Sequence, residues 1–529
     1  MSKCDVLLIS VGNEGRDRRQ SIPLALPVLK GVLENKNYQT KCIDDYFISW
    51  NTQEVYNLLD KFKPKIIGLS ATAYEFNSLK KIVRTIKSYS IEIAVILGGY
   101  CSLLKDLAKK TGADAVCHGE GEKTIIELVE IFKQPISSWN TSLKNIKGIS
   151  FVDETSGNTI KNQSRALIQN LDTLPFPDYS DFLEILREET SYWIPFYAQR
   201  GCYNNCTFCD IIPFYGEQKI RSMSPERIVQ WIRKTYEEMK KPYYLFTDDN
   251  FMSKERFLKG MISELSKSQL NNKIWINFQT RANDIIRFQH LLPELKPFIF
   301  SIELGVESFS DSQLLRFNKN ISKEQNLKAI HILSELNIPY NLYFMFLDGK
   351  TTIEELKENI KTILTLPDVP NFGLENSVPE IINDYQYSAL CDLQGNPTIK
   401  YIPFLEAFHH FLEETEEIRK AFVLYRTLKK IKSENKKTER NTNEMQNFQT
   451  SFFSSIGKSF SPRIEKLGRK RLKKALEIAG FFQNNKLKGN PNKNKQVEKE
   501  IKNFNTQIDQ ILKPFIRIGV NFEDLAENY

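Results

Sequence analysis

The sequence has no uninterrupted apolar run of the roughly 18 residues that a membrane span requires, so we expect no membrane-spanning segment. It has no internal repeat, and its first residues, MSKCDVLLIS, lack the basic region, apolar core and cleavage site of a secretory signal. We therefore expect a cytoplasmic protein. Apolar residues make up 41% and aromatic residues 12% of the 529 positions, which argues against disorder and predicts two or three folded domains.

Histidine and grouped cysteine are scarce. Of eight cysteines only Cys202, Cys206 and Cys209 lie close together, and none of the five histidines is near them. A disulfide framework is unusual in a large cytosolic chain, so these three cysteines indicate metal or redox chemistry. We expect the other five cysteines to be packing residues.

The formal net charge is +8, and much of the excess lies in Lys/Asn-rich stretches after Arg426. These basic stretches could bind the phosphates of a nucleic-acid backbone, but they lack interleaved aromatic residues and any recognisable RNA-binding module. A solvated helical surface explains them better, so a nucleic-acid partner is not favoured.

The first part of the chain alternates short apolar runs with amphipathic segments of helical spacing. Expected strands lie at 6–10, 40–43, 66–70, 93–97 and 115–118. This alternation predicts an α/β fold with a parallel, flavodoxin-like sheet over residues 1–135, whose ligand crevice lies at the carboxyl ends of the strands.

Residues 136–190 read as a linker with a hairpin, and a second alternating series follows over residues 191–385. Its expected strands lie at 196–199, 244–247, 275–279, 298–304, 342–346 and 372–374. Six such units predict a partial (βα)6 barrel with its chemistry at the strand ends. Strand signals stop near residue 385, and we expect residues 386–529 to be helical.

The most specific motif is RGCYNNCTFCD, residues 200–210, directly after the first strand of the second series. Three thiolates at this spacing can bind three irons of a [4Fe-4S] cluster and leave the fourth iron without a protein ligand. An open metal position is typical of catalytic sites. A zinc knuckle is the structural alternative, but it requires a fourth cysteine or histidine nearby.

This loop resembles the signature of the radical S-adenosylmethionine (SAM) superfamily, and Phe208 matches the aromatic residue before the last cysteine. The resemblance implies that the open iron binds the amino and carboxylate groups of SAM. The cluster then donates one electron and produces a 5′-deoxyadenosyl radical, while the protein orients the reactants.

Further matches follow three successive strands: YLFTDDNF, WINFQTR and ELGVES, the last resembling a GxES segment that approaches the SAM ribose and sulfonium. In WINFQTR, Arg281 is a candidate bidentate partner for the SAM carboxylate. Taken singly, the polar residues here are equally explained as helix caps or surface residues; their common position favours a cofactor site. The implied SAM-binding residues are Phe208, Asp248, Asp249, Arg281, Glu303, Gly305, Glu307 and Ser308.

The first domain, with the segments IIGLSAT, VILGGYC and HGEGE, resembles that of the cobalamin-binding radical SAM enzymes. The implied cobalamin-binding residues are Ser70, Thr72, Gly98, Gly99, Gly119, Glu120 and Gly121. The chain departs from the pattern in three ways. No DxHxxG segment offers an axial histidine, Tyr100 and Cys101 replace a frequent Pro-His pair, and residues 347–352, LDGKTT, lack a usual proline.

The resemblance implies methyl transfer to an unactivated carbon or a phosphinate-like centre of a small molecule, with a [4Fe-4S] cluster, SAM and cobalamin as cofactors. It also implies an external electron donor such as flavodoxin or ferredoxin. Cyclisation or rearrangement without methylation, modification of RNA or a peptide, and a non-enzymatic iron–sulfur or cobalamin sensor are the alternatives. A methylthiotransferase would need further grouped N-terminal cysteines, which are absent.

Overall fold

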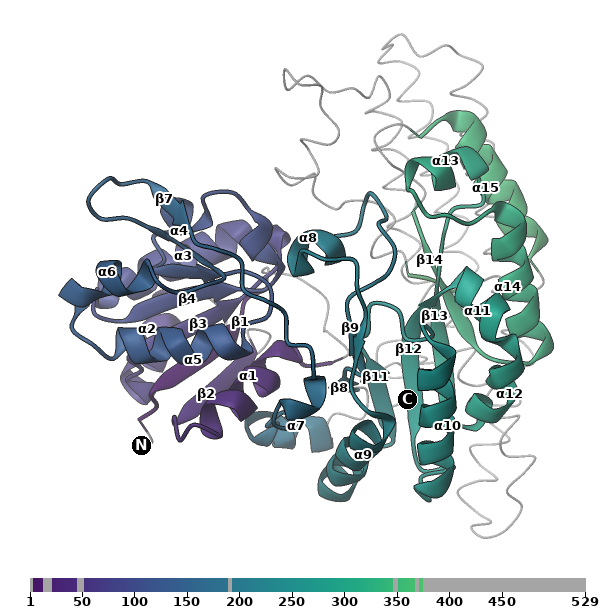
Figure 1. Cartoon of the computed structure of the whole chain (residues 1–529), viewed down its shortest axis with the longest axis horizontal. Helices are drawn as coiled ribbons and strands as arrows, with labels where there is room; N and C mark the ends of the chain where they lie inside the picture. Colours follow the sequence, from purple (N-terminus) through teal and green to yellow (C-terminus); the bar gives the residue numbers. More distant parts are fainter. Residues whose placement is uncertain are drawn as a thin grey trace, which may run out of the picture. The chain divides into compact units, whose positions relative to one another are not determined.

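The computed structural model describes residues 3–12, 21–44, 52–188, 193–345, 351–366 and 371–373 (Figure 1). The chain divides into two compact units, one within residues 1–301 and one from residue 302 onward. This boundary falls inside a strand, and the expected domains 1–135, 136–190, 191–385 and 386–529 stay a prediction.

The first sheet has the strand order β2-β1-β3-β4-β5-β6-β7. Its strands are β1 (Val6–Ser10), β2 (Thr40–Asp44), β3 (Ile66–Ser70), β4 (Ala94–Gly98), β5 (Ala115–Cys117), β6 (Ile149–Val152) and β7 (Thr159–Lys161). The first five strands are parallel in the expected flavodoxin-like order. The hairpin expected in the linker is formed by β6 and β7, which continue this sheet in antiparallel pairing.

Among the described residues, the α-helices of this part of the chain are α1 (Ala25–Glu34), α2 (Thr52–Phe62), α3 (Phe76–Tyr89), α4 (Leu107–Thr111), α5 (Glu122–Phe132), α6 (Trp139–Leu143) and α7 (Leu183–Glu188). Alternate strand residues such as Leu7, Ile67 and Val95 share one core with Leu79 and Ile82 of α3. Because side chains alternate along a strand, the remaining buried strand residues face the opposite side. Burial on both faces explains the nearly continuous apolar strand sequences.

The second sheet has the order β15-β14-β13-β12-β11-β8. Its strands are β8 (Ile194–Phe196), β11 (Tyr243–Phe246), β12 (Trp275–Arg281), β13 (Ile299–Glu307), β14 (Tyr340–Phe344) and β15 (Asn371–Gly373). The pairs β8–β11, β11–β12, β13–β14 and β14–β15 are parallel. The predicted α/β fold class is confirmed: a flavodoxin-like sheet is followed by the six strands expected for the partial (βα)6 barrel.

A short antiparallel pair, β9 (Gln199–Arg200) with β10 (Arg221–Ser222), flanks the cysteine motif. The helices of this region are α8 (Ile211–Tyr215), α9 (Pro225–Met239), α10 (Glu255–Lys267), α11 (Ala282–Phe288), α12 (Leu292–Leu295), α13 (Asp311–Arg316), α14 (Lys323–Glu335) and α15 (Ile353–Thr365). The helical segment expected over 386–529 lies outside the described residues. Within the described residues, no helix is long and apolar enough to cross a membrane.

Candidate functional site

The three grouped cysteines lie in the loop between β9 and α8. Cys202 and Cys206 are 9% and 8% exposed, Cys209 is half-buried, and Phe208 is 40% exposed. The N–H of Cys209 donates to the carbonyl of Cys206 at 3.2 Å, which turns the loop so that the cysteines share one short segment. No three potential ligands among the described residues converge on one ion. That geometry is not required here, because the thiolates of a [4Fe-4S] cluster bind three different irons.

Gly201 sets the path of the chain into this loop. Its φ of +88° lies in the left-handed region, and a Cβ placed on it would lie 2.1 Å from the carbonyl oxygen of Lys219. Its N–H donates to Oδ2 of Asp249 at 2.7 Å. Only glycine fits a backbone that is so close to a neighbouring carbonyl.

Arg281, at the end of β12, lies against the cysteines. Its Nη1 donates to Sγ of Cys206 at 3.2 Å, and its Nε donates to Oδ1 of Asn283 at 3.3 Å. Burial raises the pKa of Cys209 to about 11, partly offset by the N–H of Ile211. A cation beside the thiols favours their ionised, metal-binding form. Three thiols at cluster spacing, two of them buried, with a guanidinium beside one of them, therefore fit a [4Fe-4S] cluster.

Asp248 and Asp249 follow β11 and accept backbone hydrogen bonds. Both oxygens of Asp248 accept from the N–H of Ala198, at 3.0 and 3.2 Å, and the side chain is fully buried. Burial raises the pKa of Asp248 to about 8 and that of Asp249 to about 6. These contacts link the end of β11 to the segment that leads into the cysteine loop. Their expected contact with SAM stays a prediction.

A buried polar chain that the sequence analysis missed begins inside the loop. The hydroxyl of Tyr203 donates to Oδ2 of Asp284 at 2.5 Å, and Nδ2 of Asn250 donates to the same oxygen at 2.7 Å. The hydroxyl of Thr280 donates to Oδ1 of Asn250 at 2.9 Å. The position of Tyr203 between two cluster cysteines could have marked it as a site residue. Its partner Asp284 could not have been predicted, because it lies 81 residues away in the sequence.

In the second unit, the ELGVES segment forms the end of β13. The carboxylate of Glu303 accepts from Nδ2 of Asn341 at 2.7 Å. The pairing of β13 with β14 shifts register between Gly305 and Glu307, and Glu307 has a φ of +66°. Its carboxylate pairs with Nζ of Lys319 at 2.7 Å, and both side chains are buried. A non-glycine residue in the left-handed region carries strain, which proteins tend to retain at functional sites.

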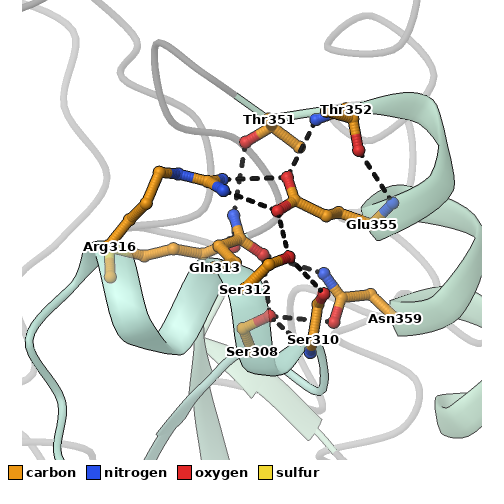
Figure 2. Close-up of polar contacts among 10 residues, drawn as sticks. Ser308, Ser310, Ser312, Gln313, Arg316, Thr351, Thr352, Glu355 and Asn359 are labelled. Carbon is orange, nitrogen blue, oxygen red and sulfur yellow. Dashed lines mark hydrogen bonds and ion pairs between the residues drawn. The ribbon is translucent and has the colours of Figure 1, made fainter.

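Ser308 belongs to the polar network drawn in Figure 2. Its hydroxyl donates to Oε1 of Gln313 at 2.7 Å and lies 3.0 Å from Oδ1 of Asn359. The same Oδ1 accepts from the N–H of Phe309 at 2.7 Å. On the neighbouring turn of α15, Glu355 pairs with Arg316. The loop after β13 is therefore held by α13 and α15 through side chains.

The residues expected to bind cobalamin lie at the strand ends of the first sheet. Ser70 pairs in register with Gly98, and the N–H of Thr72 donates to Glu75 at 2.7 Å. A Cβ on Gly99, whose φ is +82°, would approach the carbonyl of Ala71 at 2.7 Å. A Cβ on Gly98 would meet nothing within 4 Å. This edge therefore leaves open space above a strand end, as a planar corrin would require, and the residues present fit cobalamin.

The HGEGE segment follows β5 at the same edge. Gly119 has a φ of +70°, and a Cβ on Gly121 would lie 3.3 Å from the side chain of Leu29. Nε2 of His118 is 2.9 Å from the hydroxyl of Ser150, and burial lowers the pKa of His118 to about 4. His118 is thus neutral and hydrogen-bonded. The carboxylate of Glu120 is bound by two arginines and one backbone N–H.

Comparison with known proteins gives two family matches. Residues 196–363 match the Radical SAM superfamily, and residues 18–129 match the B12 binding domain. The chain is 26% identical over 374 residues to the anaerobic magnesium-protoporphyrin IX monomethyl ester cyclase of Rubrivivax gelatinosus, covering 68% of this chain and 64% of that protein. It is 26% identical over 348 residues to an uncharacterized methyltransferase of Pyrococcus horikoshii, covering 64% and 72%.

Among solved structures, the fold is similar to that of the cobalamin-dependent S-adenosylmethionine radical enzyme OxsB with aqua-cobalamin and SAM bound. The TM-score is 0.63 at 17% identity, covering 99% of this chain and 83% of that one. At this identity the likeness concerns the fold. The two family matches and the cysteine loop show that the chain contains a domain of the Radical SAM superfamily and a B12 binding domain.

More particularly, the chain combines the two domains that together define the cobalamin-binding radical SAM enzymes, and these domains imply a [4Fe-4S] cluster, SAM and cobalamin as cofactors. It spans 64% of the length of the Rubrivivax relative.

Proposed function

We propose that this enzyme transfers a methyl group from SAM to an unactivated carbon, or a phosphinate-like centre, of a small molecule. The observation that carries the proposal is the presence, in one compact unit, of a three-cysteine loop with two buried cysteines and a sheet edge left open at Gly98. The relatives include proteins named as methyltransferases and as cyclases. Methyl transfer uses both cofactor sites, whereas a sensor would need no open iron.

When bound, the cluster supplies one-electron cleavage of SAM and cobalamin supplies a methyl carrier. For a substrate R–H, the balance is R–H, two SAM and two electrons giving R–CH3, S-adenosylhomocysteine, methionine and 5′-deoxyadenosine. The electrons come from an external donor such as flavodoxin or ferredoxin. The expected cytoplasmic location also stays a prediction.

We assign Cys202, Cys206 and Cys209 to the three irons, with Nη1 of Arg281 donating a hydrogen bond to Sγ of Cys206. Gly201 and Asp249 fix the entry of the loop. This arrangement excludes water from two of the three thiols, because Cys202 and Cys206 are buried.

SAM would bind at the ends of the strands that follow the cluster loop, at the open iron. The residues we propose for this site are Phe208, Asp248, Asp249, Arg281, Glu303, Gly305, Glu307 and Ser308. For Asp248, Ser308 and Glu307 the contacts within the protein support an indirect role, because each side chain already has a protein partner. Phe208 is the most exposed side chain of the set.

Cobalamin would bind at the strand-end edge of the first sheet. The residues we propose are Ser70, Thr72, Gly98, Gly99, Gly119, Glu120 and Gly121. Backbone at glycine positions is best suited to approach a corrin or its tail closely. The carboxylate of Glu120 is occupied by arginines, so its contribution would come from the backbone.

The test is product analysis of anaerobically purified, reconstituted protein with SAM, dithionite and candidate substrates. Iron, cobalamin, 5′-deoxyadenosine and S-adenosylhomocysteine are measured together, and Cys206→Ala is the control without a complete cluster. Formation of 5′-deoxyadenosine and S-adenosylhomocysteine in equal amounts, with a methylated product, supports the proposal. Deoxyadenosine and a cyclised product without S-adenosylhomocysteine would replace it by the cyclase alternative.

A further inference from the structure

Glu120 is the centre of a buried ionic cluster. Its Oε1 accepts from Nη1 of Arg200 and from Nη1 of Arg221, both at 2.8 Å. Its Oε2 accepts from the N–H of Ile168 at 2.7 Å. Burial alone would raise the pKa of Glu120, but Arg200 and this N–H lower it below the ordinary value. The carboxylate is therefore ionised and has a donor on each oxygen.

The two arginines come from the β9–β10 pair that carries the cluster loop. Arg200 stands two residues before Cys202, and Arg221 is its direct cross-strand partner. Like charges opposite each other on paired strands repel. Glu120 bridges them, and Glu122 accepts from Nη2 of Arg200 at 2.5 Å. The first domain thus supplies the two carboxylates that make this hairpin stable.

Burial makes the hairpin dependent on those carboxylates. Glu120 is 9% exposed and Arg221 is 4% exposed. Within the described part of the chain, Nε and Nη2 of Arg221 are buried without an acceptor. Its charge is therefore compensated mainly through Nη1, which binds Glu120 and the carbonyl of Ile168. Removing one partner of a buried pair leaves an uncompensated charge.

The other end of the cluster loop contacts the same sheet edge. Phe214 of α8 lies five residues after Cys209, and its ring packs on that of Tyr100, with the ring centres 4.6 Å apart. The carbonyl oxygen of Phe214 lies 3.3 Å from where a Cβ on Gly119 would be. Both flanks of the loop are thus fixed to the segments 98–101 and 119–122.

We infer that Glu120, through Arg200 and Arg221, is a positioning residue that holds the cluster loop at a fixed distance from the cobalamin edge of the first sheet. The inference rests on the proposed function in placing cobalamin at that edge. A shift of about 1 Å in the geometry of reacting groups can lower rates by about 100-fold, so such a clamp matters for transfer between two cofactors. The carboxylate of Glu120 thereby acts through the arginines and without touching either cofactor.

The first measurement uses the full-length apoprotein and needs no cofactor. In the Glu120→Gln variant, we expect amide hydrogen exchange in peptides covering 199–209 to be about tenfold faster or more, since a buried charge loses its partner. The matched control is Asp181→Asn. Asp181 pairs with the buried Lys30 at 2.5 Å and with Lys41 at 2.9 Å in the same unit, without contacting the cluster loop. We expect wild-type exchange of 199–209 in this control.

The second measurement uses protein reconstituted with iron, sulfide and cobalamin. The reduced cluster shortens the electron-spin relaxation time of cob(II)alamin, and the shortening depends on the distance between the two cofactors. In Glu120→Gln we expect a broader distribution of relaxation times, because the distance is less well fixed. In parallel, the ratio of S-adenosylhomocysteine to 5′-deoxyadenosine should change about tenfold or more. Arg221→Gln should give the same change, and the double variant should be non-additive because the residues act as one unit.

Glu122→Gln removes one negative charge, at a single contact with Arg200, and should give an intermediate exchange rate. This variant tests the inference if Glu120→Gln does not fold. Wild-type exchange and relaxation in both variants would overturn the inference. Loss of cobalamin from Glu120→Gln with a protected loop would also overturn it, because Glu120 would then be a cofactor ligand. If wild-type protein binds no cobalamin, the proposed function fails, while the apoprotein exchange still tests the clamp.

Discussion

Gly201 shows how a single position decides whether the cluster loop can form. Two separate restrictions meet there: a left-handed φ of +88° and a carbonyl of Lys219 only 2.1 Å from the position of a Cβ. The first restriction costs an L-residue about 1–2 kcal/mol. The second requires the β9–β10 pair to open, which would move Cys202.

Replacing Gly201 by alanine should therefore lower iron incorporation. Gly216→Ala is the matched control, because Gly216 has a φ of +76° with nothing within 4 Å of its Cβ position. We expect Gly216→Ala to cost about 1–2 kcal/mol while retaining iron. Gly201→Ala should lose most of its iron after reconstitution, measured as iron per chain. Equal iron content in the two variants would contradict the role assigned to the Lys219 carbonyl.

The buried carboxyl of Asp248 predicts a pH dependence of stability. Its pKa is raised from 3.8 to about 8 by burial, so the folded state binds the proton more tightly than the unfolded state. The stabilisation is fully present below pH 3.8 and is lost as pH rises through about 8. In cluster-free protein, the urea midpoint of Asp248→Asn relative to wild type should rise with pH over this window.

Asp181 is the control for that experiment, because its contribution to stability changes with pH in the opposite direction to that of Asp248. Burial alone would raise the pKa of Asp181, but its hydrogen bonds to Lys30 and Lys41 lower it below the ordinary value. Its stabilisation is therefore present above its ordinary pKa and lost on acidification. Asp181→Asn should be less stable than wild type at neutral pH. A parallel response of the two variants would show that neither carboxyl has the assigned ionisation.

At the scale of elements, the loop after β13 depends on α15. Asn359 is fully buried and binds the N–H of Phe309, the hydroxyl of Ser308 and Oε1 of Gln313, the last at 3.0 Å (Figure 2). The position of α15 is fixed in turn by its capping box, in which Thr352 and Glu355 exchange hydrogen bonds. Helix, cap and loop thus form one polar unit next to the proposed SAM residues.

Asn359→Ala should weaken SAM binding as well as stability. It leaves the Phe309 N–H without its buried acceptor, at about 1–3 kcal/mol. Ser322→Ala, which removes the exposed cap of α14, is the control and should cost about 1 kcal/mol without affecting SAM. The dissociation constant of SAM, measured by calorimetry on reconstituted protein, should rise several-fold only in Asn359→Ala. Unchanged SAM affinity there would refute the supporting role.

Elements with a local signal were predicted closely. The apolar run expected as a strand at 6–10 forms β1 over the same residues. The hairpin of β6 and β7 was predicted, but its pairing with β5 was not, because that pairing depends on which edge of the first sheet is free. The two-residue strands β9 and β10 carry no periodic signal at all.

At the scale of the whole molecule, the cluster cysteines were predictable because their spacing is itself the ligand geometry. The partners of Glu120 were not, since Arg200 and Arg221 lie 80 and 101 residues away. Arg200 and Glu120 each stand beside a glycine in the sequence. Nothing in either local sequence indicates that the two residues pair with each other. Long-range ion pairs appear only once both sheets are folded.

The open position at Gly98 allows cobalamin binding to be separated from folding. A ligand that binds only the folded state stabilises it by about 2.7 kcal/mol at 100 times its dissociation constant. Gly98→Leu should fold as wild type does, because a Cβ there meets nothing within 4 Å. If the corrin lies over this strand end, the added side chain should abolish the stabilisation by hydroxocobalamin, measured as a shift in the thermal midpoint.

Gly112→Ala gives the complementary control. Gly112 has a φ of +87° and equally open surroundings, at the end of α4 rather than at the strand-end edge. Alanine there should lower the thermal midpoint without cofactor, by about 1–2 kcal/mol in stability, yet leave the cobalamin-induced shift intact. Gly98→Leu should therefore keep its stability and lose cobalamin binding, whereas Gly112→Ala should lose stability and keep cobalamin binding. A full cobalamin shift in Gly98→Leu would place the corrin elsewhere on the first domain and remove the basis for assigning it to this edge.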